Sequence, residues 1–199
     1  MKKAVLYVHG KNGSASEADH YRSLFADCDV IGFDYKSDTP WDCKKEFSGK
    51  IKELKEKYNN VLLIANSVGA FFSMNAFSSD DIEAAWFISP IVDMEKLITD
   101  MMKYAGVTEA ELEAKKKVKT PFGTVLSLEY LCYVRENPLK WDVPTHILYG
   151  ENDNMTGLST ITEFAEKHNA TLTVMRGGEH WFHTDGQMKF LDDWIRSTR

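Results

Sequence analysis

A single serine separates a run of branched apolar residues from an apolar segment of small and aromatic residues. The run at 61–64 predicts a buried parallel strand, and the segment after Ser67 predicts a helix packed on that sheet. A sharp strand-to-helix turn strains the residue at its apex and lifts its side chain above the sheet. Ser67 is therefore a candidate nucleophile. The alternative is that its hydroxyl caps the helix that begins near Val68.

A serine hydroxyl attacks well only when a neighbouring base takes its proton. Two residues with suitable chemistry follow later predicted strands: Asp153 follows the strand at 145–150, and His180 follows the strand at 171–175. The carboxyl ends of parallel strands share one edge of a sheet, where open α/β sheets place their sites. We therefore expect all three side chains at that edge. Asp153 has a competing interpretation, as the cap of a helix starting near Gly157.

Glycine, asparagine and serine are dense at residues 9–16, directly after the first predicted strand. A loop of this composition needs unusual backbone angles, and a loop before a helix can cradle phosphate. Neither the dinucleotide-binding spacing nor the P-loop spacing occurs in it. The loop is therefore a candidate part of a functional site, although it contains neither of the two common phosphate-binding motifs.

Length and composition limit the class of protein. The 199 residues suit one domain, with at most a small insertion, and the 43% of hydrophobic residues is ample for a core. The net charge of −6, without a basic patch, excludes nucleic acid as a partner and argues against an acidic membrane. No apolar run approaches the ~20 residues that span a bilayer. With no signal peptide at its start, we expect a cytoplasmic protein.

The cysteines and the remaining patterns predict no cofactor. Cys28, Cys43 and Cys132 are scattered and form neither a disulfide framework nor a metal motif, so reduced thiols are expected. We expect neither a metal nor an organic cofactor. The oligomeric state stays open.

Strands and helices alternate through the first half of the chain, which predicts a parallel sheet. The predicted strands lie at residues 4–8, 30–34, 61–65, 84–90, 145–150 and 171–175. The predicted helices lie at residues 17–26, 43–58, 94–106, 109–119, 126–137 and 185–197, with two more after Ser67 and Gly157. The long helical stretch between Pro90 and Thr145 breaks the alternation and predicts an insertion.

Four segments together resemble the α/β-hydrolase family, and they cover nearly the whole chain. They are the turn Ala65-x-Ser67-x-Gly69, the loop at His9-Gly10, Asp153 three residues after a strand-ending glycine, and His180 between a glycine-rich stretch and an aromatic residue. The chain order of serine, aspartate and histidine is also that of the family. The departures are Ala65 where glycine is more usual, and a start at what is usually the third strand of the family.

The resemblance implies a fold and a domain organisation. We expect a minimal α/β-hydrolase fold, with a mostly parallel sheet of about six strands flanked by helices. Residues 1–199 would form a single domain, and residues 93–140 a small helical cap inserted within it. Cap insertions enter at this place in the family and tune the choice of substrate.

The resemblance also implies catalytic roles. Ser67 would be the nucleophile, His180 the general base and acid, and Asp153 the carboxylate that orients the imidazole. The backbone N–H groups of Lys11 and Val68 would form the oxyanion hole, and Asn12 is the near alternative to Lys11.

Neighbouring residues are weaker candidates for the same roles. Glu151 and Asp93 are alternatives to Asp153, and His183 is an alternative to His180. His9 is expected to be structural, as is usual for that motif.

The substrate pocket is predicted least sharply. Asn12, Met155, Tyr130 and Phe122 are candidate pocket residues. The methionines and aromatics of the insertion have a second interpretation, as the core of the cap itself. Lys115-Lys116-Lys117 is expected to be the solvated face of a helix.

The predicted function is a serine hydrolase that cleaves a small acyl ester or thioester through an acyl-enzyme. A peptidase or a carbon–carbon bond hydrolase uses the same three residues, so the motifs do not separate these activities. A different class also stays open: a catalytically idle scaffold that binds a protein or a ligand.

Overall fold

The computed structural model describes residues 2–199 and divides them into two compact units. The first unit runs to Val92 and resumes at Lys140–Arg199, and the second is Asp93–Leu139. Within residues 2–199, no helix has both the length and the apolar character that crossing a membrane requires.

A six-stranded sheet forms the centre of the first unit, in the order β2-β1-β3-β4-β7-β8. Every neighbouring pair is parallel, which confirms the predicted fold class and strand number. The inner strands are apolar runs buried on both faces, as parallel sheets require. The strands are β1 (Lys3–Val8), β2 (Asp29–Phe33), β3 (Asn60–Asn66), β4 (Ala85–Ile88), β7 (Thr145–Gly150) and β8 (Thr171–Met175).

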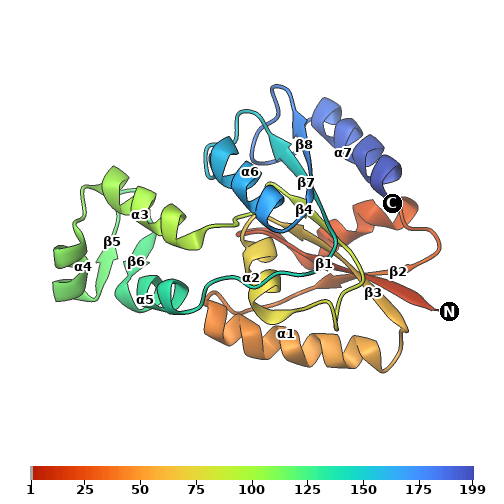
Figure 1. Ribbon diagram of the computed structural model, residues 1–199, viewed down its shortest axis with the longest axis horizontal. Helices are drawn as coiled ribbons and strands as arrows, with labels where there is room; N and C mark the ends of the chain where they lie inside the picture. The colour runs from red at the N-terminus through yellow and green to blue at the C-terminus, as the bar shows by residue number, and fades with distance from the viewer. Residues whose placement is uncertain (1) are drawn as a thin grey trace. The chain divides into compact units, whose positions relative to one another are not determined.

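Helices lie on both sides of this sheet (Figure 1). Helices α1 and α2 pack together on one side, and the 3₁₀ helix η1 and helix α7 contribute buried residues to a core on the other. The helices of this unit are η1 (Ala15–Ser23), α1 (Pro40–Lys55), α2 (Val68–Ala76), α6 (Leu158–Lys167) and α7 (Asp185–Thr198).

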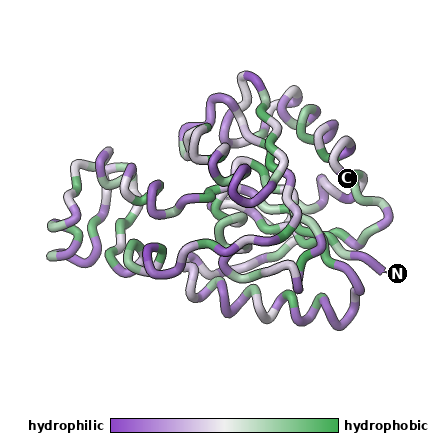
Figure 2. Tube along the Cα trace, viewed as in Figure 1, coloured by the Kyte–Doolittle hydropathy of each residue, from purple (hydrophilic) through white to green (hydrophobic). Residues whose placement is uncertain are grey.

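Successive side chains of a strand point to opposite faces of the sheet, which decides the helices that each side chain contacts. Val5 and Tyr7 of β1, with Leu62 and Ile64 of β3, face the core shared with η1 and α7. In Figure 2 the strands of the sheet are largely green, whereas α1 alternates between purple and green. Helix α1 begins at the N-cap Thr39, whose hydroxyl accepts the Asp42 N–H.

The first helix differs from its prediction. Residues 17–26 were expected to form a helix, but the helix is a 3₁₀ helix at Ala15–Ser23 with Ser14 as its N-cap. The acidic side chain of Glu17 accepts the Ser14 N–H at 2.9 Å, which moves the start of the helix two residues earlier.

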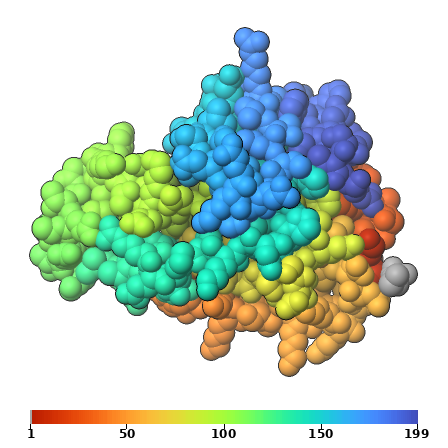
Figure 3. Space-filling model, in the orientation of Figure 1, coloured from red at the N-terminus to blue at the C-terminus, as the bar shows by residue number. Residues whose placement is uncertain are grey.

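The second unit, whose atoms are green to teal in Figure 3, contains three helices and a small antiparallel sheet. The helix predicted at 109–119 was too long: it ends at Lys115, because Lys116 adopts a left-handed φ of 63° and the next residues form a strand. Lys117 therefore lies on a strand and not on a helix face. The elements are α3 (Met94–Ala105), α4 (Glu109–Lys115), β5 (Lys117–Lys119), β6 (Val125–Ser127) and α5 (Leu128–Glu136).

Candidate active site

Ser67 lies at the apex of the turn between β3 and α2. Its φ of 50° and ψ of −121° are a strained combination for a residue with a side chain. Backbone hydrogen bonds hold this conformation: the Ser67 N–H donates to the Ile88 carbonyl at 3.0 Å, and the Ser67 carbonyl accepts the Ile91 N–H at 3.1 Å. No side-chain cap from Ser67 to α2 occurs in the described structure, so its hydroxyl is free for another partner.

Gly69 explains how the turn can be this tight. A Cβ at this position would lie 2.4 Å from the His9 carbonyl oxygen and 2.8 Å from that of Val8. The first turn of α2 therefore rests directly on the backbone at the end of β1. Only glycine leaves enough room for this approach.

Ser67, His180 and Asp153 form a continuous hydrogen-bonded chain. Nε2 of His180 lies 2.9 Å from Oγ of Ser67, and Nδ1 of His180 lies 2.7 Å from Oδ2 of Asp153. The Asp153 side chain is fully buried, whereas 19% of the His180 side chain is exposed. The buried carboxylate and the serine hydroxyl thus bind opposite nitrogens of one imidazole.

The second carboxylate oxygen of Asp153 fixes its loop. Oδ1 accepts the Met155 N–H at 2.7 Å and the Thr156 N–H at 3.1 Å. Helix α6 has Gly157 as its N-cap, so Asp153 does not cap it. Tyr149 of β7 also holds this loop, since its hydroxyl donates to the Thr156 carbonyl at 2.8 Å. Burial, followed by the charge of Asp153, raises the pKa of Tyr149, which stays a neutral donor.

The loops that carry Asp153 and His180 pack backbone against backbone. The Asn152 N–H donates to the Gly178 carbonyl at 2.8 Å. A Cβ at Gly150 would lie 2.5 Å from the Glu179 carbonyl oxygen, so the end of β7 needs a glycine there. In the sequence, Gly150 stands out only as the end of a strand pattern. The sequence signal for this close packing is the occurrence of glycines at the ends of two neighbouring strands, Gly150 after one and Gly177-Gly178 after the other.

The residues considered as alternatives to Asp153 and His180 form hydrogen bonds with other groups. Glu151 accepts the Gly177 N–H at 2.8 Å. Asp93 caps α3 by accepting the Lys96 N–H at 2.8 Å. Nδ1 of His183 lies 2.7 Å from the Trp181 carbonyl oxygen.

The glycine-rich loop passes beside Ser67. A Cβ at Gly10 would lie 3.2 Å from Cβ of Ser67, and Asn12 has a left-handed φ of 64°. Among residues 2–199, neither the Lys11 nor the Asn12 N–H donates to another protein group. Val68 is the first residue of α2, so its N–H has no acceptor within the helix.

His9 supports this loop and takes no part in the hydrogen-bonded chain. Its ring stacks on Tyr35 with centroids 4.3 Å apart, and its Nδ1 lies 2.8 Å from the Gly10 carbonyl oxygen. The Tyr35 hydroxyl donates to the His9 carbonyl at 2.9 Å.

The four candidate pocket residues fall into two groups. Asn12 and Met155 are exposed residues of the first unit, in the loops beside Ser67 and Asp153. Phe122 and Tyr130 belong to the second unit, where the Phe122 ring contacts that of Tyr104 with centroids 5.4 Å apart.

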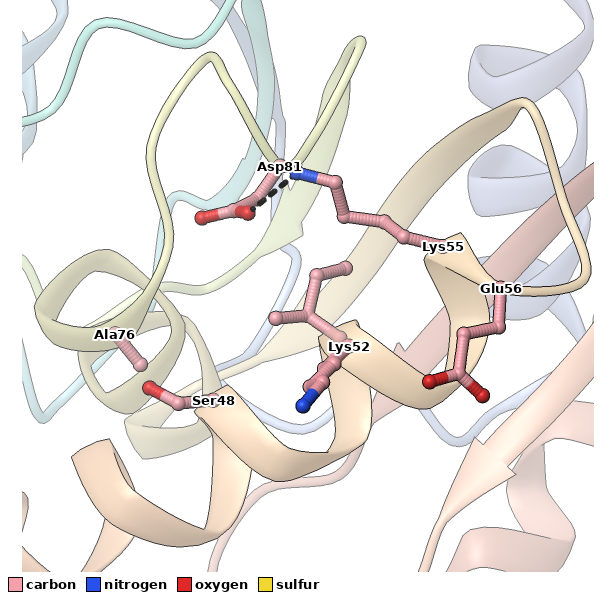
Figure 4. Close-up of a pocket in the computed structure, with 7 residues that line it drawn as sticks. Ser48, Lys52, Lys55, Glu56, Ala76 and Asp81 are labelled. Atoms are coloured by element: carbon pink, nitrogen blue, oxygen red, sulfur yellow. Dashed lines mark hydrogen bonds and ion pairs between the residues drawn. The ribbon is translucent and has the colours of Figure 1, made fainter.

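A groove of about 480 Å³ lies elsewhere on the first unit (Figure 4). It contains none of the predicted site residues, and its Lys55 is paired with Asp81 at 3.1 Å. Within residues 2–199, no group of three or more His, Cys, Asp or Glu residues is placed to hold a metal ion. The groove is lined by Ser48, Ile51, Lys52, Lys55, Glu56, Ala76 and Asp81.

Comparison with known proteins supports the fold. No protein-family model and no curated protein matches the sequence. Several solved structures are similar over 98% of this chain. Mouse alpha/beta hydrolase domain-containing protein 10 has a TM-score of 0.76 and 16% identity over 88% of its own chain, and Est1E from Butyrivibrio proteoclasticus with ferulic acid has a TM-score of 0.73 and 14% identity over 87% of its chain. A monoacylglycerol lipase from Paleococcus ferrophilus has a TM-score of 0.65 and 16% identity over 94% of its chain. At these identities the similarity shows the fold alone: this chain has the α/β-hydrolase fold.

Proposed function

We propose that this chain is a serine hydrolase that cleaves a small acyl ester or thioester through an acyl-enzyme intermediate. The observation that carries the proposal is the hydrogen-bonded chain from Ser67 through His180 to Asp153 at a strained strand-to-helix turn. A serine hydroxyl on an imidazole that also binds a buried carboxylate is the arrangement that activates a serine. The names of the similar solved structures, which include a hydrolase and a lipase, favour the same class.

In the first step, Oγ of Ser67 attacks the acyl carbonyl carbon while Nε2 of His180 takes the hydroxyl proton. Asp153 accepts the Nδ1–H of the imidazole, which fixes its tautomer and stabilises the imidazolium. The tetrahedral intermediate collapses as His180 passes the proton to the departing alkoxide or thiolate. The acyl group is then bonded to Oγ of Ser67.

In the second step, water repeats the attack on the acyl-enzyme. Nε2 of His180 takes a proton from the water as its oxygen adds to the carbonyl carbon. Collapse breaks the bond to Oγ of Ser67, which regains a proton from His180, and the carboxylic acid leaves. Throughout both steps the N–H groups of Lys11 and Val68 would bind the oxyanion, each contributing ~3 kcal/mol to transition-state stabilisation.

The second unit supplies a cap in this proposal, and thereby the choice of acyl group. Phe122 and Tyr130 are the two cap residues that we assign to the pocket.

The first test is labelling by a fluorophosphonate probe, followed by hydrolysis of p-nitrophenyl acyl esters of increasing chain length. Wild-type protein should be labelled, and Ser67→Ala should not. Ser79→Ala is the matched control, since Ser79 lies in a loop where its hydroxyl binds Asp142, and it should be labelled normally. Absence of labelling in folded wild-type protein would favour the binding scaffold, and unchanged labelling of Ser67→Ala would exclude Ser67 as the nucleophile.

A further inference from the structure

A second chain of hydrogen bonds lies directly behind the turn at Ser67. The Tyr7 hydroxyl donates to Oε2 of Glu17 at 2.5 Å and accepts a hydrogen bond from Nδ2 of Asn66 at 2.9 Å. Asn66 is the residue immediately before Ser67. None of these three residues belongs to a motif that the sequence shows.

Strand geometry explains why these polar groups meet. Asn66 follows Ile64 by two residues in β3, so both side chains point to the same face of the sheet. Tyr7 is the register partner of Ile64 in the neighbouring strand. The Tyr7 side chain is fully buried, and a buried hydroxyl requires partners. Burial is also the main cause that raises the pKa of Tyr7, so the phenol stays a neutral donor to Glu17.

The other oxygen of Glu17 binds the loop that passes beside Ser67. Oε1 accepts the Ser14 N–H at 2.9 Å. A Cβ at Gly13 would lie 2.8 Å from the same oxygen, so the loop backbone rests on the carboxylate. Glu17 therefore holds the far end of the segment that begins at Gly10.

We propose that Tyr7 and Glu17 are positioning residues that hold the loop at residues 10–14 at a set distance from Ser67. The proposal rests on the proposed function, in which the Lys11 N–H binds the oxyanion. One end of the connection is the loop backbone at Ser14, and the other is Asn66, bonded covalently to Ser67. Oxyanion donors act only within a narrow distance of the developing charge, so a tether between donor and nucleophile affects the transition state directly.

This role has a kinetic signature. Displacing the loop weakens contacts to the tetrahedral intermediate, whereas contacts to the ground-state ester are little affected. A lost tether should therefore lower kcat and leave KM nearly unchanged.

The experiment compares Tyr7→Phe and Glu17→Gln with wild type, using p-nitrophenyl butyrate as substrate. Tyr7→Phe removes only the hydroxyl, and Glu17 is exposed, so its replacement by glutamine leaves the core intact. We expect each variant to lose about tenfold in kcat with KM within about twofold of wild type. The double variant should be no worse than the poorer single variant, because both changes break one connection.

Thr145→Val is the matched control. Thr145 is buried at the start of β7, at the opposite end of the sheet from Ser67, and accepts a hydrogen bond from Nε1 of Trp141 at 2.7 Å. Its loss should lower the melting temperature as Tyr7→Phe does, without lowering kcat. An equal fall of kcat in Thr145→Val would overturn the positioning role and leave only a loss of stability.

Ser67→Ala separates the two proposals. If Ser67→Ala abolishes hydrolysis while Tyr7→Phe and Glu17→Gln keep the wild-type kcat, the positioning role is wrong and the proposed function stands. If Ser67→Ala hydrolyses the ester like wild type, the proposed function is wrong.

Discussion

The two units of the molecule hold their shapes by different means. In the first, the loops that carry the candidate active site are fixed by backbone hydrogen bonds and by glycines that allow backbone to touch backbone. The second has a small buried core that includes Leu112 and Leu131, and an exposed arginine also joins its three helices: Arg135 of α5 binds Glu95 of α3 at 2.7 Å and Glu109 of α4 at 2.5 Å.

This difference predicts a rigid first unit and a more adaptable second unit. Backbone contacts cannot shift without unfolding part of the sheet, whereas surface ion pairs rearrange at little cost. The second unit also exposes 84% of Tyr104 and 54% of Val125. We expect changes in the first unit to affect catalysis strongly, and changes in the second to affect its own stability weakly.

The largest effect is expected from Asp153→Asn. The amide can no longer hold the imidazole tautomer that accepts the Ser67 proton, so kcat should fall on the order of 10⁴-fold. Esterase assays should show this with little change in melting temperature. Glu151→Gln is the matched control, since Glu151 accepts the Gly177 N–H of the neighbouring loop, and an equal loss there would contradict the assignment of Asp153.

The next effect is expected from Gly150→Ala, which tests whether backbone packing positions His180. The added methyl group meets the carbonyl oxygen of Glu179, so the free energy of unfolding should fall by about 2 kcal/mol. Urea unfolding measures this, and kcat should fall with it because the loop carrying His180 must move. Gly49→Ala is the control: nothing lies within 4 Å of a Cβ there, and in the middle of α1 it should stabilise by about 0.5–1 kcal/mol.

A smaller effect is expected from Arg135→Ala in the second unit. The three charged groups are partly exposed and screened, so their network should contribute only about 1 kcal/mol. Hydrogen exchange should increase within residues 93–139 and stay unchanged around Ser67. Lys96→Ala, which breaks one exposed pair with Asp100 on α3, should change exchange less. Faster exchange around Ser67 in Arg135→Ala would contradict the expectation that this ion-pair network acts within the second unit alone.

The smallest effect is a pH dependence that arises in the first unit. Burial lowers the pKa of His146, whose Nδ1 lies 2.7 Å from the Thr171 hydroxyl. Unfolded histidine has a pKa of about 6.5, so below that pH the unfolded chain binds more protons. This contribution to stability is complete above that pH and is lost as the pH falls through the lowered folded-state pKa. The free energy of unfolding, measured between neutral and mildly acidic pH, should fall less in His146→Gln than in wild type.

Sequence periodicity predicted the sheet well because each strand is a local apolar pattern. The runs that became β1, β3 and β7 all lie where they were expected. The hairpin in the second unit was missed, because β5 and β6 are three residues each and gain their stability from pairing. The 3₁₀ form of η1 was missed for a related reason, since helical periodicity alone does not distinguish it from an α-helix.

The candidate site, too, could be predicted from local sequence patterns only in part. Strand ends predicted that Ser67, Asp153 and His180 would share an edge of the sheet, but which carboxylate meets the imidazole depends on loop geometry. Glu151 lies two residues from Asp153 and instead turns to the Gly177 N–H. Tyr7 and Asn66 were overlooked because a polar pair on a buried face becomes visible only once the strand register is known.

The distance along the chain between Ser67 and His180 has a consequence for synthesis. The two residues are 113 positions apart, and the loop that carries His180 packs on the end of β7. While a ribosome is still making the second half of the protein, Ser67 lacks both of the residues that the proposed mechanism pairs with it. If that mechanism holds, its hydroxyl stays as unreactive as any surface serine until the last strand docks, and a nascent or truncated chain should not attack an ester.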